Sequence, residues 1–167
     1  MNRFLSLILA LVLVFALCAC GEKAEEAGSE ANTQIANPMV ELTPQELEEA
    51  LGLALLPPDG ASDTMYYLID GTVGEVQFKY GTNGEEYSYR AQKTDAFQDI
   101  SGVYFTSAAI VDAELDPLPP ATICLDESEG FGAVTWYADG YSYSIYMGEG
   151  ATDNALISIY QLISPVQ

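Results

Sequence analysis

The sequence predicts an α+β domain, in which an antiparallel sheet of hairpins carries an N-terminal and a C-terminal helix packed on one face. Three patterns support this class. A helix-start signal lies at residues 43–46, and alternating strands flank turns at 81–84 and 139–140. Apolar residues then recur at helical spacing from Leu156 onward. Strands that lie between two helices in the chain are typical of an antiparallel sheet with helices on one side.

The first predicted helix starts after Thr43. The run Thr43-Pro44-Gln45-Glu46 combines a capping box with proline at the first helical position, where its missing N–H costs no hydrogen bond. The apolar residues that follow at helical spacing are Leu47, Ala50, Leu51 and Ala54. We expect Pro57-Pro58 to end the element.

Residues 75–90 predict a hairpin whose apolar and aromatic side chains share one face. These side chains are Val76, Phe78, Tyr80, Tyr87 and Tyr89. Two registers remain open. Turn chemistry favours a loop centred on Asn83-Gly84. Charge pairing instead favours a register that opposes Lys79 with Glu86 and Glu75 with Arg90.

A second hairpin is predicted around Asp139-Gly140, a dipeptide typical of two-residue turns. This register sets Trp136 opposite Tyr143 and Val134 opposite Ile145 on one face. The other face then carries two further pairs, Thr135 with Ser144 and Tyr137 with Ser142. Between the hairpins, residues 103–111 and 121–125 read as strands separated by the prolines of 117–120.

The last predicted element is a helix that ends at Pro165. Its apolar face consists of Leu156, Ile159, Tyr160 and Ile163. Asp153 and Asn154 lie in its first turn, where negative charge suits the helix dipole.

The N-terminal residues have the layout of a secretory signal. Arg3 provides a short positive region, and residues 4–16 are almost wholly apolar but too few to span a bilayer as a helix. The run Leu17-Cys18-Ala19-Cys20-Gly21 looks like a bacterial lipobox. This likeness implies a signal peptide over 1–19, cleavage before Cys20, and a diacylglyceryl group on the Cys20 thiol. Two acyl chains hold a protein on a membrane durably.

Three segments therefore follow from the sequence: a signal peptide over 1–19, an acidic disordered tether over 20–37, and a single domain over 38–167. The tether is rich in Ala, Glu, Ser and Asn and has few large apolar residues. The expected location is the outer face of the cytoplasmic membrane, where the lipid on Cys20 is the anchor.

Composition excludes several functional classes. The formal net charge is −20, which argues against nucleic acid as a partner because phosphate binding needs clusters of Lys and Arg. The chain contains no histidine, so the commonest general base and metal ligand are missing. After cleavage, Cys124 is the only unmodified cysteine, and we expect it to be a buried small apolar residue. No catalytic constellation is found, and the sequence points away from an enzyme.

Acidic residues provide the only candidates for a metal site. Asp112, Glu114 and Asp116 lie at alternate positions of an extended segment, on one side of it, and carboxylates of this kind are calcium ligands. Residues 126–130 also bring carboxylates together but lack EF-hand spacing. In so acidic a chain the simpler interpretation is a solvated surface, so no cofactor is expected beyond weak calcium binding.

A candidate ligand face combines two tyrosines with two basic residues. Tyr137 and Tyr146 lie on the hydroxyl-rich face of the second hairpin, where they could stack on a sugar ring or a peptide. The alternative is that this face is an ordinary sheet surface or is covered by a loop. Lys79, Arg90 and Lys93 are the only bases after residue 41. Arg90 and Lys93 would suit a carboxylate ligand or an acidic neighbour. The alternative is ion pairing of these bases with Glu75 and Glu86.

Several short motifs together resemble a known family. They are Asn37-Pro38-Met39-Val40-Glu41, Arg90-Ala91-Gln92-Lys93, Asp99-Ile100-Ser101-Gly102-Val103-Tyr104, and Trp136-Tyr137-Ala138-Asp139-Gly140-Tyr141-Ser142-Tyr143. Over residues 37–164 the chain resembles clostridial-type Gram-positive lipoproteins with a C-terminal domain of unknown function. The resemblance implies a Gram-positive cell surface and one compact α+β domain, and it brings no catalytic residues.

Two functions remain open at this point. The first is a membrane-anchored lipoprotein whose domain binds an envelope ligand or a protein partner without catalysis. The second is a cation-responsive regulatory or structural module of a membrane-associated complex, which the acidic surface suggests.

Overall fold

A computed structural model of the chain describes residues 38–105 and 109–163. All of these residues belong to one compact unit, Asn37–Gln167. The predicted signal peptide, Cys20 and the tether, together with Pro165, lie outside the described residues. Within these residues, no helix has the length and the apolar character needed to cross a membrane.

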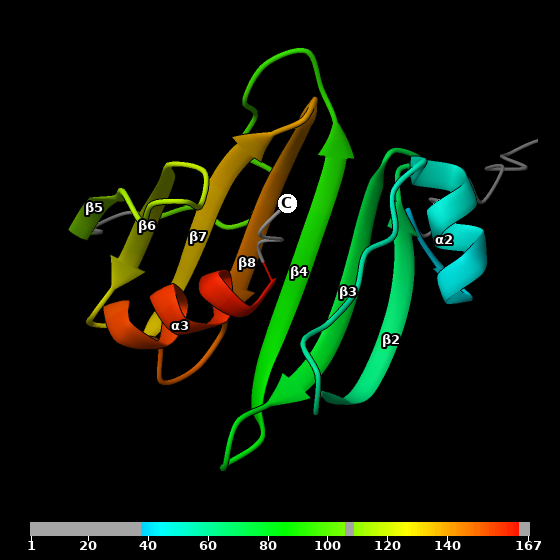
Figure 1. The fold of residues 1–167 in the computed structure, drawn as a ribbon. Helices are drawn as coiled ribbons and strands as arrows, with labels where there is room; N and C mark the ends of the chain where they lie inside the picture. The colour runs from blue at the N-terminus through cyan, green and yellow to red at the C-terminus, as the bar shows by residue number, and fades with distance from the viewer. Residues whose placement is uncertain (1–37, 106–108, 164–167) are drawn as a thin grey trace, which may run out of the picture. The chain divides into compact units, whose positions relative to one another are not determined.

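Eight strands form one antiparallel sheet, in the order β1-β2-β3-β4-β8-β7-β6-β5 (Figure 1). The strands are β1 Met39–Leu42, β2 Ser62–Ile69, β3 Val73–Tyr80, β4 Glu85–Lys93, β5 Ala109–Ala113, β6 Ala121–Asp126, β7 Phe131–Ala138 and β8 Tyr141–Met147. Strand β4 pairs with β8 at the centre, so the two predicted hairpins, β3–β4 and β7–β8, lie side by side.

Helix α2, Pro44–Leu51, begins at the predicted capping box. The Glu46 backbone N–H donates to Thr43 Oγ1 at 3.3 Å, and the Thr43 backbone N–H donates to the Glu46 carboxylate at 2.8 Å. The helix ends earlier than the expected stop at Pro57-Pro58, because Gly52 adopts a left-handed conformation with φ of 71°. A Cβ at Gly74 would clash with the side chain of Leu51, so this glycine permits the close approach of α2 to β3.

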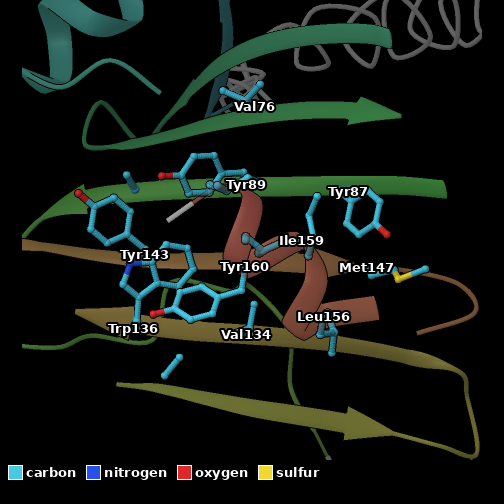
Figure 2. Close-up of a cluster of buried hydrophobic side chains, with 14 of the residues drawn as sticks. Val76, Tyr87, Tyr89, Val134, Trp136, Tyr143, Met147, Leu156, Ile159 and Tyr160 are labelled. Carbon is cyan, nitrogen blue, oxygen red and sulfur yellow. The ribbon is translucent and has the colours of Figure 1, made fainter. Parts of the chain in front are cut away.

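Helix α3, Asp153–Ile163, buries the face that its periodicity predicts: Leu156, Ile159, Tyr160 and Ile163. It contacts β6, β7 and β8. The Tyr160 and Trp136 rings lie 4.9 Å apart, and Figure 2 shows Leu156, Ile159 and Tyr160 pointing toward the side chains of the sheet. Gly132 of β7 lies under Leu156, where a Cβ would approach the leucine side chain to 2.8 Å.

Two parts of the predicted fold are confirmed: an antiparallel sheet, and one helix before and one helix after its hairpins. The domain is mostly β. The second hairpin has the predicted register, with Trp136 opposite Tyr143 and Thr135 opposite Ser144. Asp139 and Gly140 both have positive φ angles, of 51° and 82°, as a two-residue turn of this kind requires.

The first hairpin adopts the register that charge pairing favours. Glu75 lies opposite Arg90, and Lys79 lies opposite Glu86. The connecting loop consequently spans 81–84 instead of the tighter Asn83-Gly84 turn. Cross-strand charges outweigh local turn preference here.

Sequence reasoning missed two strands and misplaced a third. β1 and β2 were not predicted, although Met65–Ile69 is an apolar, β-favouring run that precedes a turn at Asp70-Gly71. The predicted strand over 103–111 is wrong in its first part, because residues 103–105 form no strand and β5 begins at Ala109. Residues 94–105 instead cross one face of the sheet.

Candidate functional site

The two faces of the sheet differ in chemistry. The core face carries Val76, Tyr89, Ile145 and Val134, which pair across β3, β4, β8 and β7 and are all 4% exposed or less. Figure 2 shows three of them, Val76, Tyr89 and Val134. The opposite face carries the residues between them. Along the same strands these are Glu75, Arg90, Ser144 and Thr135. The opposite face is therefore polar, yet much of it is buried.

The segment 94–105 covers part of this opposite face. The Gln98 backbone N–H donates to Ser142 Oγ at 2.8 Å, and the hydroxyls of Thr94 and Ser142 lie 2.9 Å apart. The Tyr137 hydroxyl donates to the Thr94 carbonyl at 3.2 Å. The ring of Phe105 lies 5.3 Å from that of Phe131. Hydrogen bonds therefore attach the covering segment to β7 and β8.

Arg90 is the central attachment point of the covering segment. Its Nη1 donates to the backbone carbonyls of Ile100 at 3.1 Å and Ser101 at 2.8 Å. Its Nε donates to the carboxylate of Glu75, which is only 1% exposed and also accepts from the Gln77 amide at 2.5 Å. A side chain at Gly102 would clash with the guanidinium, and the φ of 72° there also favours glycine.

Beyond the covered part, the opposite face contains a groove of about 470 Å³ at the β3–β4 hairpin end. It crosses four strands and is lined by Asp63, Met65, Gln77, Lys79, Glu86, Ser88 and Tyr146, with Phe78, Tyr87 and Gly148. Met65 of β2 and Tyr146 of β8 lie at its two sides, and Gln77 and Ser88, paired across β3 and β4, lie between them. The Tyr146 ring is supported by Phe131, at 6.2 Å between centroids.

Among the described residues, the single basic one that lines this groove is already paired with two carboxylates. Lys79 Nζ lies 3.3 Å from the Asp63 carboxylate and 3.5 Å from that of Glu86. The hydrogen bond to Asp63 is the main cause that raises the pKa of Lys79, and Glu86 adds to it. Ser88, by contrast, makes no side-chain hydrogen bond to any residue that the structure describes. The groove therefore offers a hydroxyl, an amide and an aromatic ring, without a free cation.

A larger hollow of about 1020 Å³ lies at the same end of the sheet but is less suited to a ligand. Its lining is mainly glycines and carboxylates, and it includes Glu85, Glu86 and Glu149 but no Lys or Arg. Its exposed lining is more polar than apolar, whereas the lining of the smaller groove is more apolar than polar, as ligand pockets generally are. We therefore place the candidate site in the smaller groove.

The four predicted ligand-face residues do not gather at one place. Tyr146 lines the groove, whereas Tyr137 lies on the same face under the covering segment. Arg90 also lies on this face, but its guanidinium is occupied by Glu75 and two carbonyls. Lys93 lies at the end of β4, opposite Tyr141, and its side chain is exposed. Its position in the strand puts it on the core face of the sheet and not on the face that carries the groove.

Sequence reasoning missed Met65, Gln77 and Ser88 as groove residues. The sequence does contain a signal for Gln77 and Ser88. Both are polar positions of the alternating first hairpin, and they lie opposite each other in the register that pairs Glu75 with Arg90. Met65 lies on a strand that was not predicted, so its position beside Gln77 had no sequence signal.

The candidate calcium ligands are not assembled. Asp112 accepts a hydrogen bond from the Thr122 hydroxyl at 3.3 Å, and Glu114 and Asp116 are exposed beyond the end of β5. Across residues 38–105 and 109–163, no group of three His, Cys, Asp or Glu side chains is placed to hold a metal ion. In the 126–130 turn, Asp126 accepts from the Ser128 hydroxyl at 2.6 Å and from two backbone N–H groups. The Ser128 hydroxyl is the main cause that lowers the pKa of Asp126.

Cys124 lies on the opposite face in β6 and is partly buried. Burial is the main cause that raises the pKa of its thiol, and the negative charge of Asp99 adds to this. A raised pKa disfavours the thiolate, the reactive form, so Cys124 is not suited to nucleophilic chemistry.

Comparison of the chain with protein-family models, curated proteins and solved structures gave no match.

Proposed function

We propose that the protein is a lipid-anchored, extracytoplasmic, non-catalytic binding protein, whose ligand occupies the groove beside Tyr146. Its signal peptide would end at Ala19, and a diacylglyceryl group on Cys20 would hold it on the outer face of the cytoplasmic membrane. The likeness to Gram-positive lipoproteins belongs to the same proposal.

One observation carries the binding function: the groove combines a partly exposed aromatic ring with polar groups that can still form hydrogen bonds. Tyr146 offers a flat face for stacking, and the Ser88 hydroxyl and the Gln77 amide lie close by on the same face. The Gln77 amide nitrogen donates to Glu75, which leaves its carbonyl oxygen to accept. Binding sites generally combine apolar walls with a few placed polar groups in this way.

The charges favour a neutral ligand. Lys79 is held between Asp63 and Glu86, so an anionic ligand would have to displace an existing carboxylate. A strongly cationic ligand would have to compete with Lys79 for the same two carboxylates. A neutral sugar, with one ring face for Tyr146 and hydroxyls for Ser88 and Gln77, fits this chemistry best.

The finer description of the fold is also part of this proposal. We assign the domain to the α+β class, with both helices on the core face. Leu51 of α2 lies against Gly74, and Leu156 of α3 lies against Gly132. Gly74 pairs with Ala91, Ala91 with Tyr143, and Tyr143 with Trp136. Gly132 lies four residues before Trp136 on β7, so the two glycines share one face of the sheet.

Thermal unfolding of the full chain in detergent tests the binding site. Neutral cell-wall sugars and short neutral peptides are added in turn. A ligand at a hundredfold excess over its Kd adds about 2.7 kcal/mol to the free energy of unfolding and raises Tm by several degrees. We expect Tyr146→Ala to abolish the shift with a sugar. The matched control is Tyr104→Ala, at a tyrosine that is 94% exposed and outside the groove.

Three outcomes would contradict this proposal. They are no shift with any sugar, a shift that Tyr146→Ala leaves intact, and a shift with calcium alone. The last outcome would favour a cation-responsive module instead. The anchor is tested separately: Cys20→Ala should remove incorporated palmitate from the protein in growing cells, and unchanged labelling would refute lipidation at Cys20.

A further inference from the structure

Strand β5 is an open edge of the sheet. It pairs with β6 on one side, from Ala109 opposite Leu125 to Ala113 opposite Ala121. On its other side it pairs with no strand that the structure describes, and it lies at the end of the sheet in Figure 1. A free strand edge presents backbone N–H and C=O groups that an extended segment of another protein can pair with.

The side chains of this edge are apolar on both faces of the sheet. Ile110 is 68% exposed and Val111 is 41% exposed. Because they are neighbours in a strand, they project to opposite faces. Edge strands are usually protected by lysine, proline or a bulge, and β5 contains none of these. Its one charged residue is Asp112.

The charge around β5 indicates what would pair with it. Asp112 lies within the strand, Glu114 and Asp116 follow it, and Asp126 ends the neighbouring strand. No Lys or Arg follows Lys93 in the chain. A second copy would bring the same acidic strand against this one, in a protein whose formal net charge is already −20. An extended basic segment would instead be attracted to it.

We propose that β5 is a docking edge for an extended, lysine- or arginine-rich segment of a partner protein, which adds to the sheet as a further strand. Backbone hydrogen bonds supply the pairing. Ile110 and Val111 contact apolar residues of the segment on the two faces, while its basic residues meet Asp112 and Glu114. This inference does not depend on the groove, which lies across β2, β3, β4 and β8.

Fluorescence anisotropy of the full chain in neutral detergent tests the proposal. The probe is a labelled peptide with the repeat Lys-Lys-Val-Val, which as a strand carries both residue types on each face, in about 0.15 M salt so that long-range attraction is screened. Two comparison peptides separate the contributions. One replaces Lys with Glu, and the other keeps Lys but carries N-methyl groups on all its backbone amides, which block pairing along both edges. We expect saturable binding of the first peptide, no binding of the second, and binding of the third weakened about tenfold or more.

Two variants locate the site. Ile110→Lys adds a repulsive charge at an exposed position, and we expect it to weaken binding about tenfold or more. Val40→Lys is the matched control on the other edge strand, β1, where Val40 is 54% exposed. The proposal is overturned by equal binding of the N-methylated peptide, by equal losses in the two variants, or by no saturable binding. Concentration-dependent dimerisation that Ile110→Lys abolishes would overturn it in favour of a second copy.

Discussion

The two faces of the sheet come from the same alternating strands but are closed in different ways. On the core face, α3 packs aromatic and aliphatic side chains against the sheet, as in the contact between Tyr160 and Trp136. On the opposite face, the covering segment 94–105 is attached through a few polar atoms, chiefly those of Arg90 and Ser142. Many buried apolar residues hold α3 on the core face, whereas a few polar side chains hold the covering segment on the opposite face. Single substitutions should therefore reveal the difference.

The largest effect is expected from Trp136→Ala on the core face. Trp136 is 3% exposed, and its ring lies 5.0 Å from that of Tyr143 and 4.9 Å from that of Tyr160. Removing it leaves a large cavity, and the free energy of unfolding should fall by about 3–5 kcal/mol. Urea denaturation measures this loss. A loss no greater than that caused by Tyr104→Ala would show that the aromatic cluster contributes little.

Arg90→Met should cost a similar amount, about 3–5 kcal/mol, although Arg90 lies on the polar face. The substitution leaves Glu75, 1% exposed, without its cation, and it releases the carbonyls of Ile100 and Ser101. The double variant Glu75→Gln/Arg90→Met should recover much of the loss, because no buried charge remains.

The matched control for Arg90 is Lys79→Met. Lys79 also pairs with carboxylates on the same hairpin, but its side chain is 40% exposed. We expect a loss of about 1 kcal/mol or less in urea denaturation. Equal losses for Arg90→Met and Lys79→Met would contradict the view that Arg90 closes this face.

Ser142→Ala should have an intermediate effect, about 1–3 kcal/mol. Ser142 is fully buried, and its hydroxyl accepts from the Gln98 backbone N–H and contacts the Thr94 hydroxyl. Because these bonds hold the covering segment and not the core, amide hydrogen exchange should increase in 94–105 and stay unchanged in α3. The control is Ser144→Ala: Ser144 is equally buried on the same strand, but its Oγ has no hydrogen-bond partner among the described residues. Uniformly faster exchange in Ser142→Ala would contradict the local role.

Asp126→Asn should cause the smallest loss of stability, and the size of that loss should depend on pH. The hydrogen bonds that Asp126 accepts lower its pKa in the folded state below the usual value of about 3.9. The stability that the carboxylate contributes is therefore present above that value and is lost as the pH falls through the folded-state pKa. We expect the variant to be less stable than the original chain at pH 7, and the difference in Tm to narrow on acidification. A difference that is constant down to pH 3 would contradict this.

The same contrast explains how much the sequence could predict. The core face follows from period-2 alternation, so Val76, Tyr89, Val134 and Ile145 are found together from sequence alone. The buried face of α3 follows from helical spacing in the same way. Charge pairing also identified the correct register of the first hairpin as one of two, because Glu75 and Arg90 lie opposite each other only in that register.

The opposite face was not predictable in the same way. Glu75, Ser142 and Ser144 alternate as exposed residues would, yet all three are buried, and Ser142 binds the irregular segment that crosses this face. Arg90 accordingly binds backbone carbonyls ten and eleven residues ahead, which no local pattern signals. The groove brings Met65 beside Gln77 and Tyr146 beside Ser88 through strand order, which single-sequence periodicity does not encode.

The position of the basic residues has a consequence for proteolysis. In the described residues, Lys79, Arg90 and Lys93 are the only bases, and all three lie on β3 or β4, inside the sheet. At the last of these sites, the following amide of Thr94 is hydrogen-bonded to the Gly140 carbonyl at 2.9 Å. A protease that cuts after Lys and Arg can therefore cleave the described domain only when these interior strands open. Its cleavage rate would report opening of the centre of the sheet, undisturbed by fraying of β5 or of α3.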